Sequence, residues 1–207
     1  VEFLQKHHEV SVLYFQNLSG WQGAIQFLSS IWNKRAADQV KSRIKEFRPD
    51  VVHIHNWHFA IGPLVFRAIH DLNVPIVHTV HNYRLLCPSG ILLHQGKLFT
   101  DSLQQSFPWS AVRNKVYRES LLLTLWLAFV VWFHKKIGTW NNIVLYICLT
   151  SFAIDQFQKS TFGVPENQFM VKPNFRSQNV LDINIKSELH FLFIGRLSEE
   201  KGIEVLL

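Results

Sequence analysis

The chain has 207 residues, of which 48% are hydrophobic and 17% charged, and its formal net charge is +6 at pH 7. A chain of this length can bury one good core, or one domain and part of a second. The basic residues are scattered and no nucleic-acid-binding motif is visible, so we expect no nucleic-acid partner. The positive charge either attracts phosphate groups or only keeps the protein soluble. The two cysteines, Cys87 and Cys148, are far apart, which excludes a disulfide scaffold and fits a reducing compartment.

Taken in chain order, apolar runs typical of strands alternate with segments typical of helices. A helix end over residues 1–6 comes first, with no strand or Gly-rich turn before it. Strands are predicted near residues 9–15, 50–55, 75–80, 143–149, 167–171 and 189–194. Helices are predicted near residues 33–47, 59–72, 111–137, 151–160 and 198–207. This alternation predicts an α/β fold, with a parallel sheet covered by helices on both faces.

One apolar run stands out from this rhythm. The segment Leu121–Phe133 is almost uninterrupted in apolar residues and is flanked by Arg118, Lys135 and Lys136. As a helix it spans roughly 20 Å, against roughly 30 Å for the hydrocarbon core of a membrane. Three interpretations stay open: a core helix beneath the sheet, a helix at a membrane surface, and a membrane span.

Polar residues follow the predicted strand at 75–80. His81 comes directly after it, and Asn82, Tyr83 and Arg84 continue the loop as hydrogen-bond donors. Ligands of open parallel sheets bind beyond the carboxyl ends of the strands, so this loop is placed where a substrate would lie. Imidazole titrates near neutral pH and can donate to a leaving group. The alternative is a strand-end histidine bonded only to backbone.

A second set of polar residues ends the strand at 50–55. His53, His55 and His58 could in principle bind zinc. The string nearly matches a dinuclear hydrolase motif, but Trp57 stands where an aspartate ligand is needed. We therefore expect no metal here. We expect His55 and Asn56 to line a cleft, with His53 packed inside the strand.

The end of the chain predicts a phosphate site. The strand at 189–194 stops at Gly195, and Ser198 is a good N-cap for the helix that follows. Arg196 and Lys201 flank the helix start. A helix N-terminus with two cations beside it is a natural seat for phosphate. Solvated surface cations are the alternative.

Four motifs in consistent order resemble family 4 glycosyltransferases. They are residues 48–56 (RPDVVHIHN), 74–84 (VPIVHTVHNYR), 171–175 (VKPNF) and 195–202 (GRLSEEKG). The resemblance implies a retaining enzyme of the GT-B architecture, which has two Rossmann-like domains. It implies that Arg196 and Lys201 contact the diphosphate of a nucleotide-sugar donor and that His81 lies in the cleft near donor and acceptor. It also implies a first strand–helix unit that this chain lacks.

The domain assignment follows from the same resemblance. We expect an acceptor-side domain over 1–173, an interdomain linker over 174–188 and the truncated start of a donor-binding domain over 189–207. We expect donor contacts from Gly195, Arg196 and Lys201, catalysis by His81, and acceptor contacts from His55, Asn56, Asn82, Tyr83 and Arg84. Beyond the nucleotide sugar as co-substrate, no cofactor is expected.

The insert at 85–110 is a long polar and aromatic excursion, and such loops are often lids. In some relatives it carries several cysteines; here only Cys87 remains, and the aligned positions hold Phe99, Ser102 and Val116. We expect no metal in it.

The function that these features imply is sugar transfer to a carbohydrate or lipid-linked acceptor, with this fragment inactive alone. We expect a cytoplasmic protein, with possible peripheral contact to the inner face of the membrane. Two alternatives stay open. One is a nucleotide-sugar epimerase of the same architecture, against which the loop at 81–84 argues. The other is a non-catalytic remnant or sugar-binding module.

Overall fold

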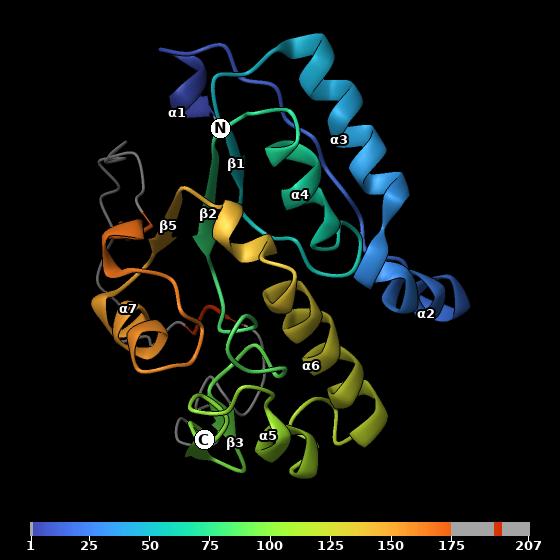
Figure 1. Ribbon diagram of the computed structural model, residues 1–207, viewed down its shortest axis with the longest axis vertical. Helices are drawn as coiled ribbons and strands as arrows, with labels where there is room; N and C mark the ends of the chain where they lie inside the picture. Colours follow the sequence, from blue (N-terminus) through green and yellow to red (C-terminus); the bar gives the residue numbers. More distant parts are fainter. Residues whose placement is uncertain (1, 175–192, 196–207) are drawn as a thin grey trace, which may run out of the picture.

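A four-stranded parallel sheet organises the molecule (Figure 1). The computed structural model describes residues 2–174 and 193–195. The strands run in the order β1-β2-β5-β6. Their bounds are Val52–Ile54 for β1, Ile76–Val80 for β2, Leu145–Cys148 for β5 and Phe169–Val171 for β6. The predicted α/β class, with a parallel Rossmann-like sheet and flanking helices, is confirmed.

The connections between strands explain where loops gather. Helix α4 (Leu64–His70) joins β1 to β2, and α7 (Ser151–Gln158) joins β5 to β6. The connection from β2 to β5 is longest and holds α5 (Trp109–Arg113) and α6 (Leu121–Lys136). Because β1 pairs directly with β2 in parallel, with Ile54 opposite His78, the loops after both strands leave the sheet side by side.

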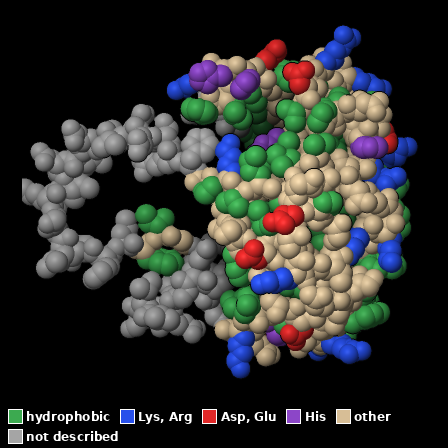
Figure 2. Space-filling view, turned by 60° about the vertical axis from the view of Figure 1, so that its left-hand side comes forward, with side chains coloured by type: hydrophobic (Ala, Val, Ile, Leu, Met, Phe, Trp, Pro, Cys, Tyr) green, Lys and Arg blue, Asp and Glu red, His purple; other side chains and the backbone are tan. Residues whose placement is uncertain are grey.

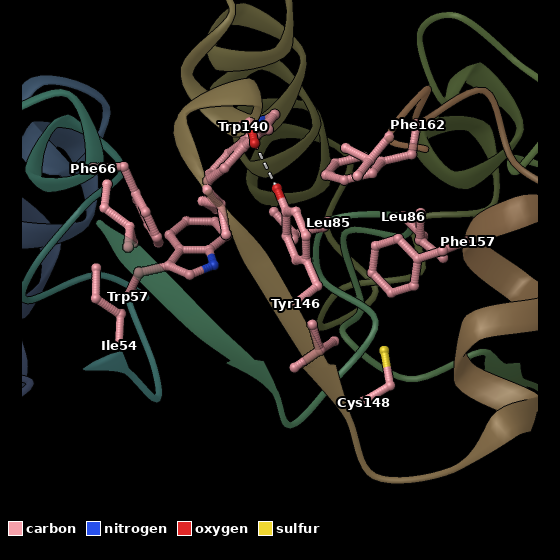
Figure 3. Close-up of a cluster of buried hydrophobic side chains, with 14 of the residues drawn as sticks. Ile54, Trp57, Phe66, Leu85, Leu86, Trp140, Tyr146, Cys148, Phe157 and Phe162 are labelled. Atoms are coloured by element: carbon pink, nitrogen blue, oxygen red, sulfur yellow. Dashed lines mark hydrogen bonds between the residues drawn. The ribbon is translucent and has the colours of Figure 1, made fainter. Parts of the chain in front are cut away.

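The core lies against one face of the sheet. Side chains alternate along a strand, and the buried set on this face includes Ile76, His78 and Tyr146. Figure 3 shows aromatic side chains from α4, β5 and the segment before it meeting there, with the Tyr146 hydroxyl donating to the Trp140 carbonyl at 2.7 Å. Phe66 of α4 packs edge-on against Trp140, with ring centroids 5.5 Å apart. Cys148 is fully buried on this face as well.

Helix α3 (Lys34–Phe47) packs against α4 and has clear sequence causes. The Asn33 side chain caps its start by accepting from the Ala36 N–H at 3.1 Å. Its buried residues recur at helical spacing: Ala36, Ala37, Val40 and Ile44. It ends at Arg48, which adopts a left-handed φ of 53°, directly before Pro49.

The remaining elements are short. They are α1 (Glu2–Gln5), α2 (Gly20–Ser29), β3 (Leu93–His94), β4 (Lys97–Leu98) and the 3-10 helices η1 (Ser30–Trp32), η2 (Thr139–Asn142) and η3 (Glu166–Gln168). Strands β3 and β4 form a hairpin inside the insert at 85–110. Gln95 and Gly96 both have positive φ, the geometry of a type I′ turn.

Two predicted elements are wrong. Residues 9–15 form no strand, because the backbone there pairs with no other strand in the described part of the chain; only Phe15 packs against the core. The helix predicted over 111–137 is two helices, α5 and α6. Lys115, Arg118 and Glu119 adopt positive φ between them, which breaks the helical backbone. Residues 59–72 are helical only over α4.

Helix α6 is partly buried. Its buried residues are Thr124, Leu127, Ala128, Val130 and His134, while Leu122 is 74% exposed. Within 2–174 and 193–195, no helix is long and apolar enough to cross a membrane.

The predicted linker and the start of the second domain lie outside the described residues, apart from residue 174 and residues 193–195. The domain boundaries therefore stay a prediction.

Candidate functional site

A small pocket opens where β1 and β2 end. It has an empty volume of about 250 Å³ and is lined by residues of both strand ends: His55, Asn56, Trp57, His58, His78, Thr79, Val80, His81, Asn82, Arg84 and Leu85. The two loops that the sequence placed at a ligand site therefore meet in one pocket. The parallel pairing of β1 and β2 brings them together.

His55 and His81 form a hydrogen-bonded pair at the mouth of this pocket. His55 Nδ1 and His81 Nε2 are 3.1 Å apart and the rings stack with centroids 5.4 Å apart. One of these two nitrogens must carry the proton and the other must be free to accept it. Both side chains are exposed, so a bound molecule can reach the pair. Burial, followed by the neighbouring His81, lowers the pKa of His55.

His53 extends this pair along the same side of β1. Its ring lies 4.2 Å from that of His55 by centroid, and its Nε2 is 2.7 Å from the Thr79 hydroxyl on β2. Burial is the largest cause that lowers the His53 pKa to about 4, and the charges of His55 and Lys172 add to it. His53 is therefore neutral near pH 7. His53 lies next to His55. We expected its side chain to be packed inside the strand, but the side chain is exposed.

The loop after His81 is held by its own hydrogen bonds. The Asn82 side-chain oxygen accepts from the Arg84 N–H at 3.1 Å, and the Tyr83 N–H donates to the Gly90 carbonyl at 2.9 Å. Arg84 Nη1 donates to the Pro88 carbonyl at 2.7 Å, which aims the guanidinium toward the insert. Asn82 and Arg84 line the pocket; Tyr83 packs against the core and is not among the lining residues.

Of the residues that follow β1, some face the pocket and others pack into the core. Asn56 is exposed and its side-chain oxygen accepts from the His58 N–H at 3.3 Å. Trp57, which stands where a metal-binding aspartate would be needed, is only 5% exposed and packs beside Trp140. No group of three or more His, Cys, Asp or Glu side chains arranged to hold a metal ion occurs in the part of the chain that the structure describes.

A family model described as Glycosyltransferase Family 4 matches residues 2–176. The chain belongs to glycosyltransferase family 4.

A relative of this family 4 domain comes from Klebsiella pneumoniae. It is described as an uncharacterized 42.6 kDa protein in the cps region and is 23% identical over 177 residues. The match covers 86% of this chain but 41% of the relative, so the chain spans less than half of that protein's length. No solved structure matches the chain significantly.

Among the predicted donor-binding residues of this family 4 protein, only Gly195 is described, and it does not line the pocket. Gly195 is described as an exposed residue, and Arg196 and Lys201 lie outside the described residues. Several pocket residues were not assigned to the site from the sequence, among them His58, His78 and Thr79. Thr79 could have been found from its spacing, because it lies two residues before His81 on the same side of β2. His78 could not, because its burial depends on α4.

Proposed function

We propose that this chain supplies the acceptor-side half of a retaining glycosyltransferase that uses a nucleotide-sugar donor. The acceptor is a hydroxyl of a carbohydrate or of a lipid-linked sugar. The observation that carries the proposal is the hydrogen-bonded pair of His55 and His81, placed in a pocket at the carboxyl ends of two parallel strands. The proposed boundaries are 1–173 for this domain, 174–188 for the linker and 189–207 for the start of the donor domain.

In this proposal His81 faces the reacting groups and His55 orients it. A neutral imidazole can donate to the departing diphosphate or receive the acceptor proton, and the bond to His55 fixes which ring nitrogen carries the hydrogen. Asn56, Asn82 and Arg84 supply polar atoms for the acceptor around the pocket. Tyr83 contributes through the loop rather than through the pocket wall.

Departure of the nucleotide diphosphate is assigned to cations. Arg196 and Lys201 would stabilise the charge that develops on the leaving group, which needs no metal or other cofactor. The proposed setting is the cytoplasmic side of a membrane that carries the acceptor.

The test is a substitution of His81 in the longer protein that contains this domain and a donor domain. His81→Ala should lower turnover by about 10²–10⁴-fold, because an acid–base or leaving-group contact is lost. His70→Ala is the matched control, since His70 is an exposed histidine at the end of α4 and does not line the pocket. A folded His81→Ala protein with near-normal turnover would contradict the proposed role.

The donor assignment is tested separately. Arg196→Ala should cost about 1.5–3 kcal/mol of charge-assisted bonding, seen as weaker donor binding or slower turnover. Unchanged donor binding and unchanged turnover would remove Arg196 from the site.

A further inference from the structure

Arg84 is a partly buried cation with no counter-ion among the residues that the structure describes. Its Nε is fully enclosed and has no hydrogen-bond partner. The ion pairs within the described residues join Lys41 to Asp71 and Arg43 to Glu46, so neither involves Arg84. Burial lowers the pKa of Arg84, and the neighbours that oppose this effect are Tyr117 and Cys87 rather than a carboxylate.

His58 lies beside Arg84 and also has a ring nitrogen without a hydrogen-bond partner. Its Nε2 is also enclosed without a partner. Burial, followed by the charge of Arg84, lowers the His58 pKa to about 2, so the ring is neutral and adds a hydrogen-bonding atom without a second charge. Both side chains line the pocket that holds His81.

Within residues 2–174 and 193–195, no acidic residue lines either pocket beside Arg84. A second pocket, with an empty volume of about 440 Å³, lies between the insert and α6 and shares Arg84 and Leu85 with the first. Neither pocket is lined by an aspartate or glutamate, and Lys135 lines the second. The local field at Arg84 is therefore positive, and a negatively charged group is favoured there.

Contacts within the fold place the guanidinium but do not neutralise it. Arg84 reaches the Pro88 carbonyl, lies 5.5 Å from the centre of the Tyr117 ring, and closes over Gly90, where an added Cβ would come within 2.7 Å of Nη2. These contacts hold the side chain in one position. A buried charge without an ionic partner is unfavourable, and an anion in the pocket would offset that cost.

We propose that Arg84 and His58 bind an anionic group of the acceptor, a phosphate or a carboxylate, next to His81. That the bound anion belongs to the acceptor rests on the proposed function. That an anion binds here at all rests on the uncompensated charge of Arg84. Arg84 provides charge and a planar fork that suits both anions. His58 provides one further hydrogen bond. The substrate class is then a negatively charged acceptor rather than a neutral sugar.

The test uses the 207-residue chain and measures binding without any sugar transfer. Backbone amide NMR spectra are recorded during titration with inorganic phosphate in one arm and glucuronate in the other, at constant ionic strength. Resonances of residues 55–58 and 81–85 should shift and saturate. Arg84→Met should weaken binding at least about tenfold, and His58→Leu about threefold. The anion that binds more tightly, phosphate or glucuronate, shows whether the site prefers a phosphate or a carboxylate.

Two control variants separate the possible outcomes. Arg113→Met removes an exposed arginine of α5 and should leave binding unchanged. Arg196→Met tests the predicted donor site and should leave the shifts at 55–58 and 81–85 intact. Loss of those shifts in Arg196→Met with retention in Arg84→Met would overturn the proposal, as would equal binding by Arg84→Met and the unchanged chain.

Thermal unfolding with and without anion distinguishes anion binding by Arg84 from a purely structural role of this residue. The favoured anion should raise the melting temperature of the unchanged chain and not that of Arg84→Met. If Arg84→Met does not fold, His58→Leu decides, because it leaves the guanidinium and its loop in place; unchanged anion binding in that variant overturns the proposal. Sugar-transfer results with His81→Ala are independent of all these measurements.

Discussion

Two buried histidines, His78 and His134, are kept neutral by burial, and each makes defined hydrogen bonds. His78, 3% exposed, donates from Nδ1–H to the Ile54 carbonyl at 2.9 Å, across the β1–β2 pair. His134 of α6 is fully buried; its Nε2–H donates to the Ile31 carbonyl at 2.7 Å, which leaves Nδ1 to accept from the Thr139 hydroxyl at 2.9 Å. Burial lowers both pKa values to about 4.

These residues predict a loss of stability in mild acid. Because the folded pKa lies below the usual value of about 6.5, the unfolded chain takes up protons first as the pH falls. The free energy of unfolding should therefore fall between about pH 6.5 and pH 4 and level off below. Each buried histidine accounts for about 2 kcal/mol of loss by pH 5.

The measurement is urea unfolding at pH 7.5 and pH 5.0. His78→Asn keeps a donor near the Nδ1 position and removes the titrating group. Its free energy of unfolding should therefore fall by about 2 kcal/mol less between the two pH values than that of the unchanged chain. His70→Asn, at an exposed position, is the control and should follow the unchanged chain. Equal losses in His78→Asn and the unchanged chain would show that His78 does not set the acid sensitivity.

At the scale of elements, the insert at 85–110 is anchored into the core rather than loosely attached. Phe99, directly after β4, is 8% exposed and its N–H donates to the Leu92 carbonyl at 3.0 Å. Its neighbour Leu98 is 61% exposed. Figure 2 shows hydrophobic side chains at the surface too, among scattered charges, so sequence hydrophobicity alone does not tell which residue anchors the insert.

This difference between neighbours gives a matched stability test. Phe99→Ala should lower the free energy of unfolding by about 3 kcal/mol because it leaves a cavity. Leu98→Ala should change it by less than about 0.5 kcal/mol. Denaturant unfolding of both variants checks the pair. Similar small effects would mean that the insert is not part of the cooperative core.

The membrane contact predicted for Leu121–Phe133 would lie on α6, and the structure places α2 beside that helix. Helix α2 buries none of its residues and exposes Trp21, Ile25 and Leu28. The Trp126 indole N–H of α6 donates to the Phe27 carbonyl of α2 at 3.0 Å, so the two apolar surfaces are neighbours. Apolar side chains can enter the headgroup boundary while basic residues meet anionic lipid.

Vesicle sedimentation across salt concentrations tests this contact. We expect binding to anionic vesicles at low salt that is released at high salt, and about tenfold weaker binding by the double variant Trp21→Ser, Leu122→Ser. Leu98→Ser is the control, because it removes an exposed leucine from the hairpin. Absence of binding at low salt would contradict the expectation, and binding that survives salt and alkaline wash would indicate insertion.

At the scale of the whole molecule, sequence reasoning succeeded where local signals agree. All four strands of the sheet were predicted within one to two residues, since apolar runs follow Pro49, Pro75 and Pro165 or precede polar strand ends. Parallel pairing then follows from the alternation with helices. The same rule placed His55 and His81 at neighbouring strand ends, and the structure joins them by a hydrogen bond.

The failures have non-local causes. Residues 9–15 have strand composition, but a strand forms only where a partner edge is available, and composition does not show this. The break between α5 and α6 depends on positive φ at Lys115, Arg118 and Glu119, none of which is a glycine. The lack of a counter-ion for Arg84 among the described residues is a property of three-dimensional packing. No spacing in the sequence indicates it.

The proposed division into two domains predicts that the 207-residue chain cannot transfer sugar by itself. The family 4 match spans residues 2–176, and the chain covers 41% of its Klebsiella relative. In the proposal, Arg196 and Lys201 act within a complete donor domain, because cations in water are strongly screened. Purified chain incubated with nucleotide sugars and acceptor lipids should release no more nucleotide than a protein-free blank. The longer protein should release it in an acceptor-dependent way. Acceptor-dependent release by the chain alone would show that the donor site is complete within it.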